Sequence, residues 1–184
     1  QYWTDWVKTT SIPNIHQKET LRSALVLKLH QYEDTGGIIA SGSTSLPEHP
    51  QSGRNWDYRY CWIRDAFYTL KALNSLGHFE ELEKYFHYIE NIIQHHQGRI
   101  QPLYTITTGK DIVERELGLP GYLGNTPVRI GNAAYTHIQN DVYGQVLVSL
   151  QPLYTDQRLI TRSRSKSLTL IHFLLDKISE VMDQ

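Results

Sequence analysis

Apolar residues recur at helical spacing in several stretches of the chain, and each stretch predicts a helix. Residues three, four and seven positions apart share one face of a helix, so each stretch can bury one side. The predicted helices run approximately over residues 17–32, 64–77, 80–97, 132–153 and 162–182, after a short amphipathic opening piece. In the last of them, the residues expected to be buried are Leu168, Ile171, Leu174, Leu175 and Ile178.

Strands are expected to be short and few. Residues 38–46 favour an extended segment, and residues 101–106 alternate as a short strand does. Between residues 117 and 131 lies a stretch rich in glycine and proline. Loops of this length usually serve a site or a lid in compact domains. The pattern predicts an all-α fold with minor short strands, either a bundle or part of an α/α toroid.

The composition narrows the possible partners. The chain has 184 residues, of which 40% are hydrophobic, enough for one domain with a real core. Its 18 basic and 19 acidic residues are interspersed and leave a formal net charge of -1, so neither nucleic acid nor an anionic membrane is expected as a partner. A neutral partner fits better.

The start of the chain shows no signal-peptide pattern, and no apolar run is long enough to span a bilayer. These features favour a cytoplasmic location. The chain begins with Gln1 rather than methionine. A processed product or a fragment that has lost a leader is therefore an open alternative.

No metal or other cofactor is predicted. His87, His95 and His96 lack a carboxylate at ligand spacing and are interpreted as solvent-exposed. The single cysteine, Cys61, has no neighbouring histidine to activate it and is interpreted as a small buried residue.

Two glutamates precede the glycine-rich stretch. Glu114 and Glu116 flank Arg115 and are interpreted as partners in surface ion pairs. A pair of carboxylates facing a cleft is the alternative.

The most unusual stretch runs from Arg54 to Asp65 and contains four aromatic residues, three arginines and two aspartates. Aromatic faces can pack against the C–H side of a sugar ring, while arginine and aspartate bond its hydroxyls. The stretch therefore predicts a pocket wall that leads into a helix. For Asp57, capping of that helix is the alternative role. The residues predicted to bind substrate here are Trp56, Asp57, Tyr58, Trp62, Arg64 and Asp65.

A second cluster covers residues 129–135 and 139–144. Asn132, Gln139 and Asp141 supply amide and carboxylate groups at the start of a predicted helix, and they are also predicted to bind substrate. If the helices lie side by side, both clusters open at the same end of the domain. Capping by Asn132, with a small-residue packing face through Ala133 and Gly144, is the alternative.

The stretch from Arg54 to Asp65 resembles the signature of glycoside hydrolase family 15, which includes glucoamylases, glucodextranases and bacterial trehalases. The likeness extends to residues 45–48, 120–122, 127–134 and 139–144. The resemblance implies a six-hairpin, (α/α)6 toroid with a sugar pocket at one end of the helices. It also implies hydrolysis with inversion at the anomeric carbon by two glutamates.

By motif position, the resemblance implies that Arg64 and Asp65 hold the hydroxyls of the innermost sugar. Tyr58 would lie near the anomeric carbon and Trp62 would support the wall. The general acid and base of inverting hydrolysis stand roughly 6.5–9.5 Å apart. The family places both of them beyond the position of Gln184. Residues 1–184 are therefore interpreted as part of a glucoamylase-like catalytic domain, truncated before the catalytic glutamates.

The leading hypothesis is a fragment of an inverting, exo-acting glycoside hydrolase that releases glucose from maltooligosaccharides, trehalose or related α-glucosides. A non-catalytic glucoamylase-like domain with a regulatory or glycan-binding role is the alternative, and a toroid enzyme for another sugar is a third. The expected partner is a carbohydrate. An arc of a toroid leaves apolar helix faces uncovered, so the fragment is also expected to self-associate.

Overall fold

The computed structural model describes residues 1–96, 99–156 and 164–183, without the side chains of residues 164–167. Helices dominate, and the strands form two short antiparallel pairs, β1 with β2 and β3 with β4. The mostly helical class is therefore confirmed. The elements are α1 (Tyr2–Lys8), α2 (Gln17–Leu29), β1 (Cys61–Trp62), α3 (Ile63–Ser75), α4 (Phe79–His95), β2 (Leu103–Tyr104), β3 (Arg115–Leu117), η1 (Tyr122–Gly124), β4 (Val128–Ile130), η2 (Ala133–Thr136), α5 (Asp141–Thr155) and α6 (Arg164–Met182).

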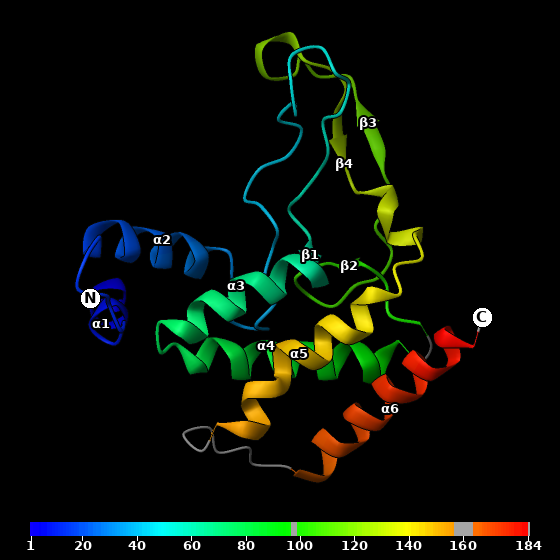
Figure 1. The fold of residues 1–184 in the computed structure, drawn as a ribbon. Coiled ribbons are helices and arrows are strands. Elements are labelled where there is room, and N and C mark those ends of the chain that lie inside the picture. The colour runs from blue at the N-terminus through cyan, green and yellow to red at the C-terminus, as the bar shows by residue number, and fades with distance from the viewer. Residues whose placement is uncertain (97–98, 157–163, 184) are drawn as a thin grey trace.

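The core lies where α3 packs against α4 and α5 (Figure 1). On α3, Ala66, Leu70 and Leu73 follow each other at helical spacing and are buried. Helix α4 buries Leu82 and Ile89 from its own stripe. These stripes are the ones that the hydrophobic pattern predicts. The pattern is informative because burial of one face stabilises an amphipathic helix more than its intrinsic propensity does.

A tight turn joins α3 to α4. Gly77 has a φ of 86°, a left-handed conformation that favours glycine. The N–H of Gly77 donates to the carbonyl of Asn74, and the N–H of His78 donates to the carbonyl of Leu73, each at 3.0 Å. This is a Schellman motif, which ends α3 and returns the chain antiparallel along it.

The prediction for the last helix was partly wrong. Leu174 is buried as expected, but Leu168 and Leu175 are 54% and 48% exposed, and Leu170 is buried instead. The reason is that α6 packs against α5, so only the stripe through Leu170 and Leu174 faces a neighbour. The predicted start of this helix at residue 162 lies outside the described residues, as does the predicted end of the helix over residues 80–97.

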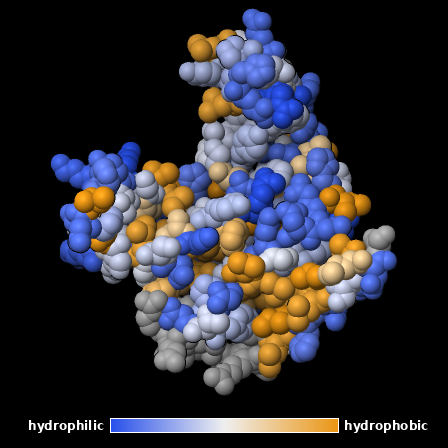
Figure 2. All heavy atoms as spheres, viewed as in Figure 1, coloured by the Kyte–Doolittle hydropathy of each residue, from blue (hydrophilic) through white to orange (hydrophobic). Residues whose placement is uncertain are grey.

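Apolar side chains remain exposed on the outer sides of α5 and α6. Hydrophobic surface gathers over these two helices (Figure 2). The large exposed residues on them include Val148, Tyr154, Leu168 and Leu175. None of the helices in the described residues combines the length and hydrophobicity that a membrane span requires.

The prediction of one helix from residue 132 to residue 153 was also wrong. A 3-10 turn, η2, comes first, and α5 begins only at Asp141. The side-chain oxygen of Asn132 accepts a hydrogen bond from the N–H of Ala134 at 3.1 Å, which satisfies the start of η2. His137 then adopts an extended conformation and separates the two helical pieces.

A mostly extended layer of the molecule stands above the helices (Figure 1). Residues 40–45 and 56–60 run antiparallel there, because the N–H of Ala40 donates to Tyr60, that of Ser41 to Tyr58 and that of Ser45 to Trp56. The β3–β4 ribbon, from Arg115 to Ile130, projects beside them. This layer carries Trp56, Asp57 and Tyr58, three of the residues predicted to bind substrate.

An ion pair lies buried between α2 and α4. Lys28 Nζ is 3.1 Å from Glu81 Oε1, and the two side chains are only 3% and 2% exposed. Glu33 adds a second carboxylate 3.0 Å from Lys28. The indole of Trp6 donates to Glu81 at 2.7 Å and stacks on His78 with 3.9 Å between the ring centroids. These contacts attach α1 and α2 to the core.

Cys61 is buried, with 1% of its surface exposed, as predicted. Burial raises the pKa of its thiol to about 12, although a hydrogen bond with Tyr88 acts in the opposite direction. Since the thiolate is the reactive form, we expect Cys61 to react with Ellman's reagent far more slowly in the native protein than in urea. Equal rates in the two conditions would contradict this burial.

Candidate functional site

A cavity of about 440 Å³ opens between this extended layer and the start of α3. Its volume lies within the range of small-molecule sites. Segments that are far apart in the chain line it: the loop before residue 58, the start of α3, the residue just before β3, and η2. The residues that line it are Glu48, Arg54, Trp56, Tyr58, Trp62, Arg64, Asp65, Glu114, Asn132, Ala133, Ala134 and His137.

The extended backbone decides which residues of the aromatic cluster reach the cavity. Successive side chains of an extended segment point to opposite sides. Trp56 and Tyr58 line the cavity, whereas Asp57 between them is fully buried. The structure thus brings Trp56, Tyr58, Trp62, Arg64, Asp65 and Asn132 together, as the sequence predicts.

Asp57 faces away from the cavity wall. Its carboxylate forms a bidentate ion pair with Arg59, with both distances at 2.9 Å, and it accepts a bond from the N–H of Gly131 at 3.2 Å. Gly131 has a φ of 82°, and a Cβ there would lie 2.1 Å from the carbonyl oxygen of Val113. The geometry gives Asp57 the role of joining the aromatic segment to the end of β4, rather than contact with a ligand.

Arg64 and Asp65 project from the first turn of α3, with side chains 45% and 41% exposed. The guanidinium of Arg64 lies over the ring of Trp62, with 5.3 Å from Cζ to the ring centroid, and is 3.4 Å from the carboxylate of Asp65. This long ion pair leaves donors of Arg64 and acceptor positions of Asp65 available. A rigid helix end therefore presents both kinds of group to one ligand.

Electrostatics keeps the Tyr58 hydroxyl protonated. Burial raises the pKa of Tyr58, and the negative charges of Glu48 and Asp65 raise it further, while Arg54 acts against them. Glu48 is itself ionised, because the hydrogen bond from Arg54 lowers the pKa of its carboxyl. Tyr58 can thus donate a hydrogen bond at the cavity while Glu48 and Asp65 accept.

Of the three residues of the second cluster that were predicted to bind substrate, two do not line the cavity. Asn132 lines it, and its side-chain amide also donates to the backbone oxygen of Asp57 at 3.0 Å. Gln139 and Asp141 follow the break after η2, and neither is among the lining residues. Asp141 is exposed and accepts a bond from Gln145 at 2.7 Å. The expectation that all three amide and carboxylate residues share one wall fails because the predicted helix is interrupted.

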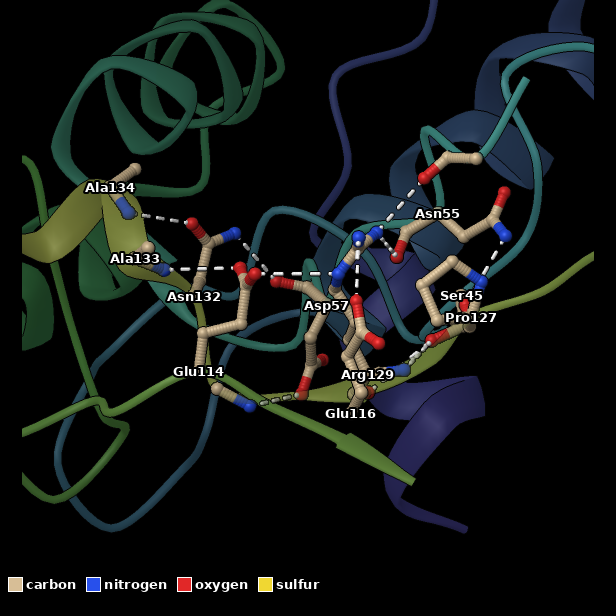
Figure 3. A network of polar contacts seen from close by, with 12 residues as sticks. Ser45, Asn55, Asp57, Glu114, Glu116, Pro127, Arg129, Asn132, Ala133 and Ala134 are labelled. Atoms are coloured by element: carbon tan, nitrogen blue, oxygen red, sulfur yellow. Dashed lines mark hydrogen bonds and ion pairs between the residues drawn. The ribbon is translucent and has the colours of Figure 1, made fainter. Parts of the chain in front are cut away.

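Several lining residues were not predicted to bind a ligand. Glu114 contributes a carboxylate from beside β3 (Figure 3). It accepts a bond from the N–H of Ala133 at 3.2 Å and pairs with Arg129 at 3.3 Å. Glu116 also pairs with Arg129, at 3.1 Å. Both glutamates therefore form ion pairs, as interpreted, but Glu114 also faces the cavity, as the alternative stated. Arg54 and Glu48 lie in stretches that the sequence analysis singled out, but they were not named as ligand-binding residues. His137 gave no signal, because only the fold brings it to the wall.

The described residues contain no group of three or more histidine, cysteine or acidic side chains that could hold a metal. The cavity instead combines aromatic faces with charged donors and acceptors. Such a wall suits a neutral, polyhydroxylated ligand, since hydroxyls both donate and accept while C–H groups pack on rings. The fold and this wall together are typical of carbohydrate-active proteins.

Comparison with protein families agrees with this reading. Residues 14–183 match the model of glycosyl hydrolases family 15. The match covers most of the chain, so the chain belongs to this family. No solved structure matches the chain.

Curated relatives are similar over most of this chain. The trehalase of Thermoplasma acidophilum is 38% identical over 152 residues, which are 83% of this chain and 26% of the relative. The trehalase of Mycolicibacterium smegmatis is 41% identical over 153 residues, or 80% of this chain and 23% of the relative. The trehalase of Mycobacterium tuberculosis is 40% identical over 152 residues, which are 80% of this chain and 22% of the relative. The chain thus spans about a quarter of the length of these relatives.

Proposed function

We propose that residues 1–184 supply the sugar-binding half of the pocket of an inverting, exo-acting α-glucosidase whose substrate is trehalose or a related α-glucoside. The observation that carries the proposal is the shared cavity of Trp56, Tyr58, Trp62, Arg64 and Asp65. The trehalase relatives support an α-glucoside as the ligand.

In this proposal the terminal glucose packs on the aromatic side chains while Arg64 donates to its hydroxyls and Asp65 accepts from them. Tyr58, held protonated, donates toward the anomeric end. Asn132, whose amide also bonds the backbone of Asp57, contributes to the opposite wall. Groups that bind more tightly as the ring distorts toward the transition state lower the barrier, so this half of the pocket contributes to the rate as well as to affinity.

We assign the general acid and the general base to residues outside this chain. The antiparallel pair α3–α4, with α5 packed on both, supports a view of residues 1–184 as one arc of an (α/α)6 toroid. In a closed toroid each helix is covered on both sides. The exposed apolar residues of α5 and α6 would then face helices that the rest of the domain provides.

The proposal is tested with the full-length protein and a panel of trehalose, maltose and isomaltose. We expect release of glucose in its β form from at least one of them, which polarimetry or proton NMR of the fresh product would detect. Binding of glucose without hydrolysis of any substrate would instead support a non-catalytic glycan-binding role. Absence of both would reject the proposed function.

Residues 1–184 expressed alone should hydrolyse none of these sugars and should self-associate. The reason is the apolar surface on α5 and α6, where Val148 and Leu168 are 57% and 54% exposed. Burying such surface gains about 25 cal/mol per Å². Analytical ultracentrifugation measures the mass, and a glucose assay measures turnover. A monomeric, active chain would contradict both expectations and make Glu114 the first candidate for a catalytic carboxylate.

A further inference from the structure

One arginine joins the segments that form the cavity wall without lining the cavity itself. Arg129 lies on β4, and its side chain is only 12% exposed. It is absent from the cavity lining, yet two lining residues, Trp56 and Glu114, are in direct contact with it. Figure 3 shows its guanidinium at the centre of the polar network.

The guanidinium makes contacts in several directions. Nη1 donates to the carbonyl of Gly53 at 3.0 Å and to that of Asn55 at 3.3 Å. Nη2 donates to Glu116 at 3.1 Å, and Nε lies 3.3 Å from Glu114 in an ion pair without a hydrogen bond. The plane of the group also lies over the ring of Trp56, with 4.6 Å from Cζ to the ring centroid. Three hydrogen bonds in fixed directions, combined with a flat face over an indole ring, suit a planar guanidinium, and a lysine ammonium cannot reproduce this combination.

The backbone of the same residue is anchored as well. The N–H of Arg129 donates to Ser45 Oγ at 2.7 Å, and its carbonyl accepts from Thr44 Oγ1 at 2.8 Å. Both ends of the residue are therefore fixed, and so is the position of the guanidinium. Side chains locked by such contacts hold the groups that touch a ligand in a narrow range of positions.

We propose that Arg129 is a positioning residue for the sugar pocket. This role rests on the proposed function. Arg129 holds the Trp56 ring and the Glu114 carboxylate at the positions in the cavity wall where they contact the bound glucosyl unit. Glu114 presents its carboxylate toward a sugar hydroxyl, while Trp56 packs on the ring. Arg129 itself does not touch the sugar.

The test uses three variants of the full-length protein: Arg129→Gln, Arg129→Lys and the control Arg115→Gln. Arg115 lies on the neighbouring strand, is exposed and does not line the cavity, so its replacement removes the same charge without changing the wall. In Arg129→Gln we expect KM to rise about 10–100-fold, more than kcat falls. The reason is that Trp56 and Glu114, once displaced, bind the sugar more weakly. Arg129→Lys should give an intermediate KM, and Arg115→Gln a wild-type value.

A second measurement reports on the wall without a sugar. Labelling with 5-fluorotryptophan gives a ¹⁹F resonance for Trp56, identified by its loss in Trp56→Phe. This resonance should shift in Arg129→Gln and stay in place in Arg115→Gln. A merely structural role would lower the melting temperature and the active fraction but leave KM unchanged. An unchanged KM or an unshifted Trp56 resonance would therefore overturn the inference.

Failure of the proposed function is recognised separately. If the wild-type protein hydrolyses none of the α-glucosides, the dissociation constant for glucose, read from the Trp56 resonance, replaces KM. A weaker constant in Arg129→Gln than in Arg115→Gln then supports the positioning role. Equal constants, or no glucose binding by the wild-type protein, would overturn it.

Discussion

Replacing Asp65 by alanine in the full-length protein should lower kcat/KM for its α-glucoside by about 10²–10³-fold, the usual cost of one bond that strengthens in the transition state. The fold should stay intact, because the carboxylate is 41% exposed and its ion pair with Arg64 is long, at 3.4 Å. In the proposed site the carboxylate accepts hydrogen bonds from sugar hydroxyls. Without it, these hydroxyls have no partner.

The matched control is Asp5→Ala. Asp5 is 54% exposed and pairs with Lys8 on α1, away from the cavity. It should keep wild-type kinetics. Steady-state kinetics with the preferred sugar, together with thermal unfolding of both variants, separates activity from stability. Wild-type kcat/KM in Asp65→Ala would exclude Asp65 from the sugar site.

Replacing Glu81 by leucine should lower the free energy of unfolding by about 3–5 kcal/mol, because it leaves the buried Lys28 with one carboxylate partner fewer. Lys28 is 3% exposed, and its remaining partner, Glu33, is 49% exposed. The indole N–H of Trp6 loses its acceptor as well. Urea denaturation measures the change.

Two further variants identify the cause. The double change Lys28→Met with Glu81→Leu should recover most of the lost stability, because removing both charges leaves no uncompensated ion. Glu80→Ala, at a 72% exposed position on the same helix, should cost less than about 1 kcal/mol. A loss in the double variant as large as in Glu81→Leu would show that the lost charge is not the cause.

The same pair predicts a pH dependence. Burial raises the pKa of the Glu81 carboxyl, but hydrogen bonds from Trp6 and Lys28 outweigh this effect and lower it overall. A carboxyl with a lowered native pKa contributes its full stability above the unfolded pKa, near 4.3, and loses it as the pH falls through the native pKa. Stability should therefore decline on acidification below about pH 4.3.

The sequence predicts the helical core well, because burial of Leu70 and Leu73 on α3 and of Ile89 on α4 repeats at a period that the pattern displays directly. It also predicts a pocket wall at Trp56 and Tyr58, where aromatic and charged residues lie within a few positions. The burial of Asp57 could have been found from the alternation of sides in an extended segment.

Other features were not accessible from local pattern. Glu114 and His137 reach the cavity only because β3 and η2 fold back beside the aromatic segment. The buried partner of Lys28 lies on another helix, and no spacing rule connects the two. Gln139 and Asp141 were assigned to the wall on the assumption of one continuous helix, which Asn132 and His137 interrupt.

The contacts that hold together the segments behind the cavity wall join positions far apart in the chain. The bond from Asn55 to Pro127 spans 72 positions, and that from Thr44 to Arg129 spans 85, whereas the turn between α3 and α4 is local. Loops of this size close at an entropic cost that local helices do not meet. During refolding, helical circular dichroism should therefore return before the cavity forms, and competence to bind a sugar should mark the last stage of folding.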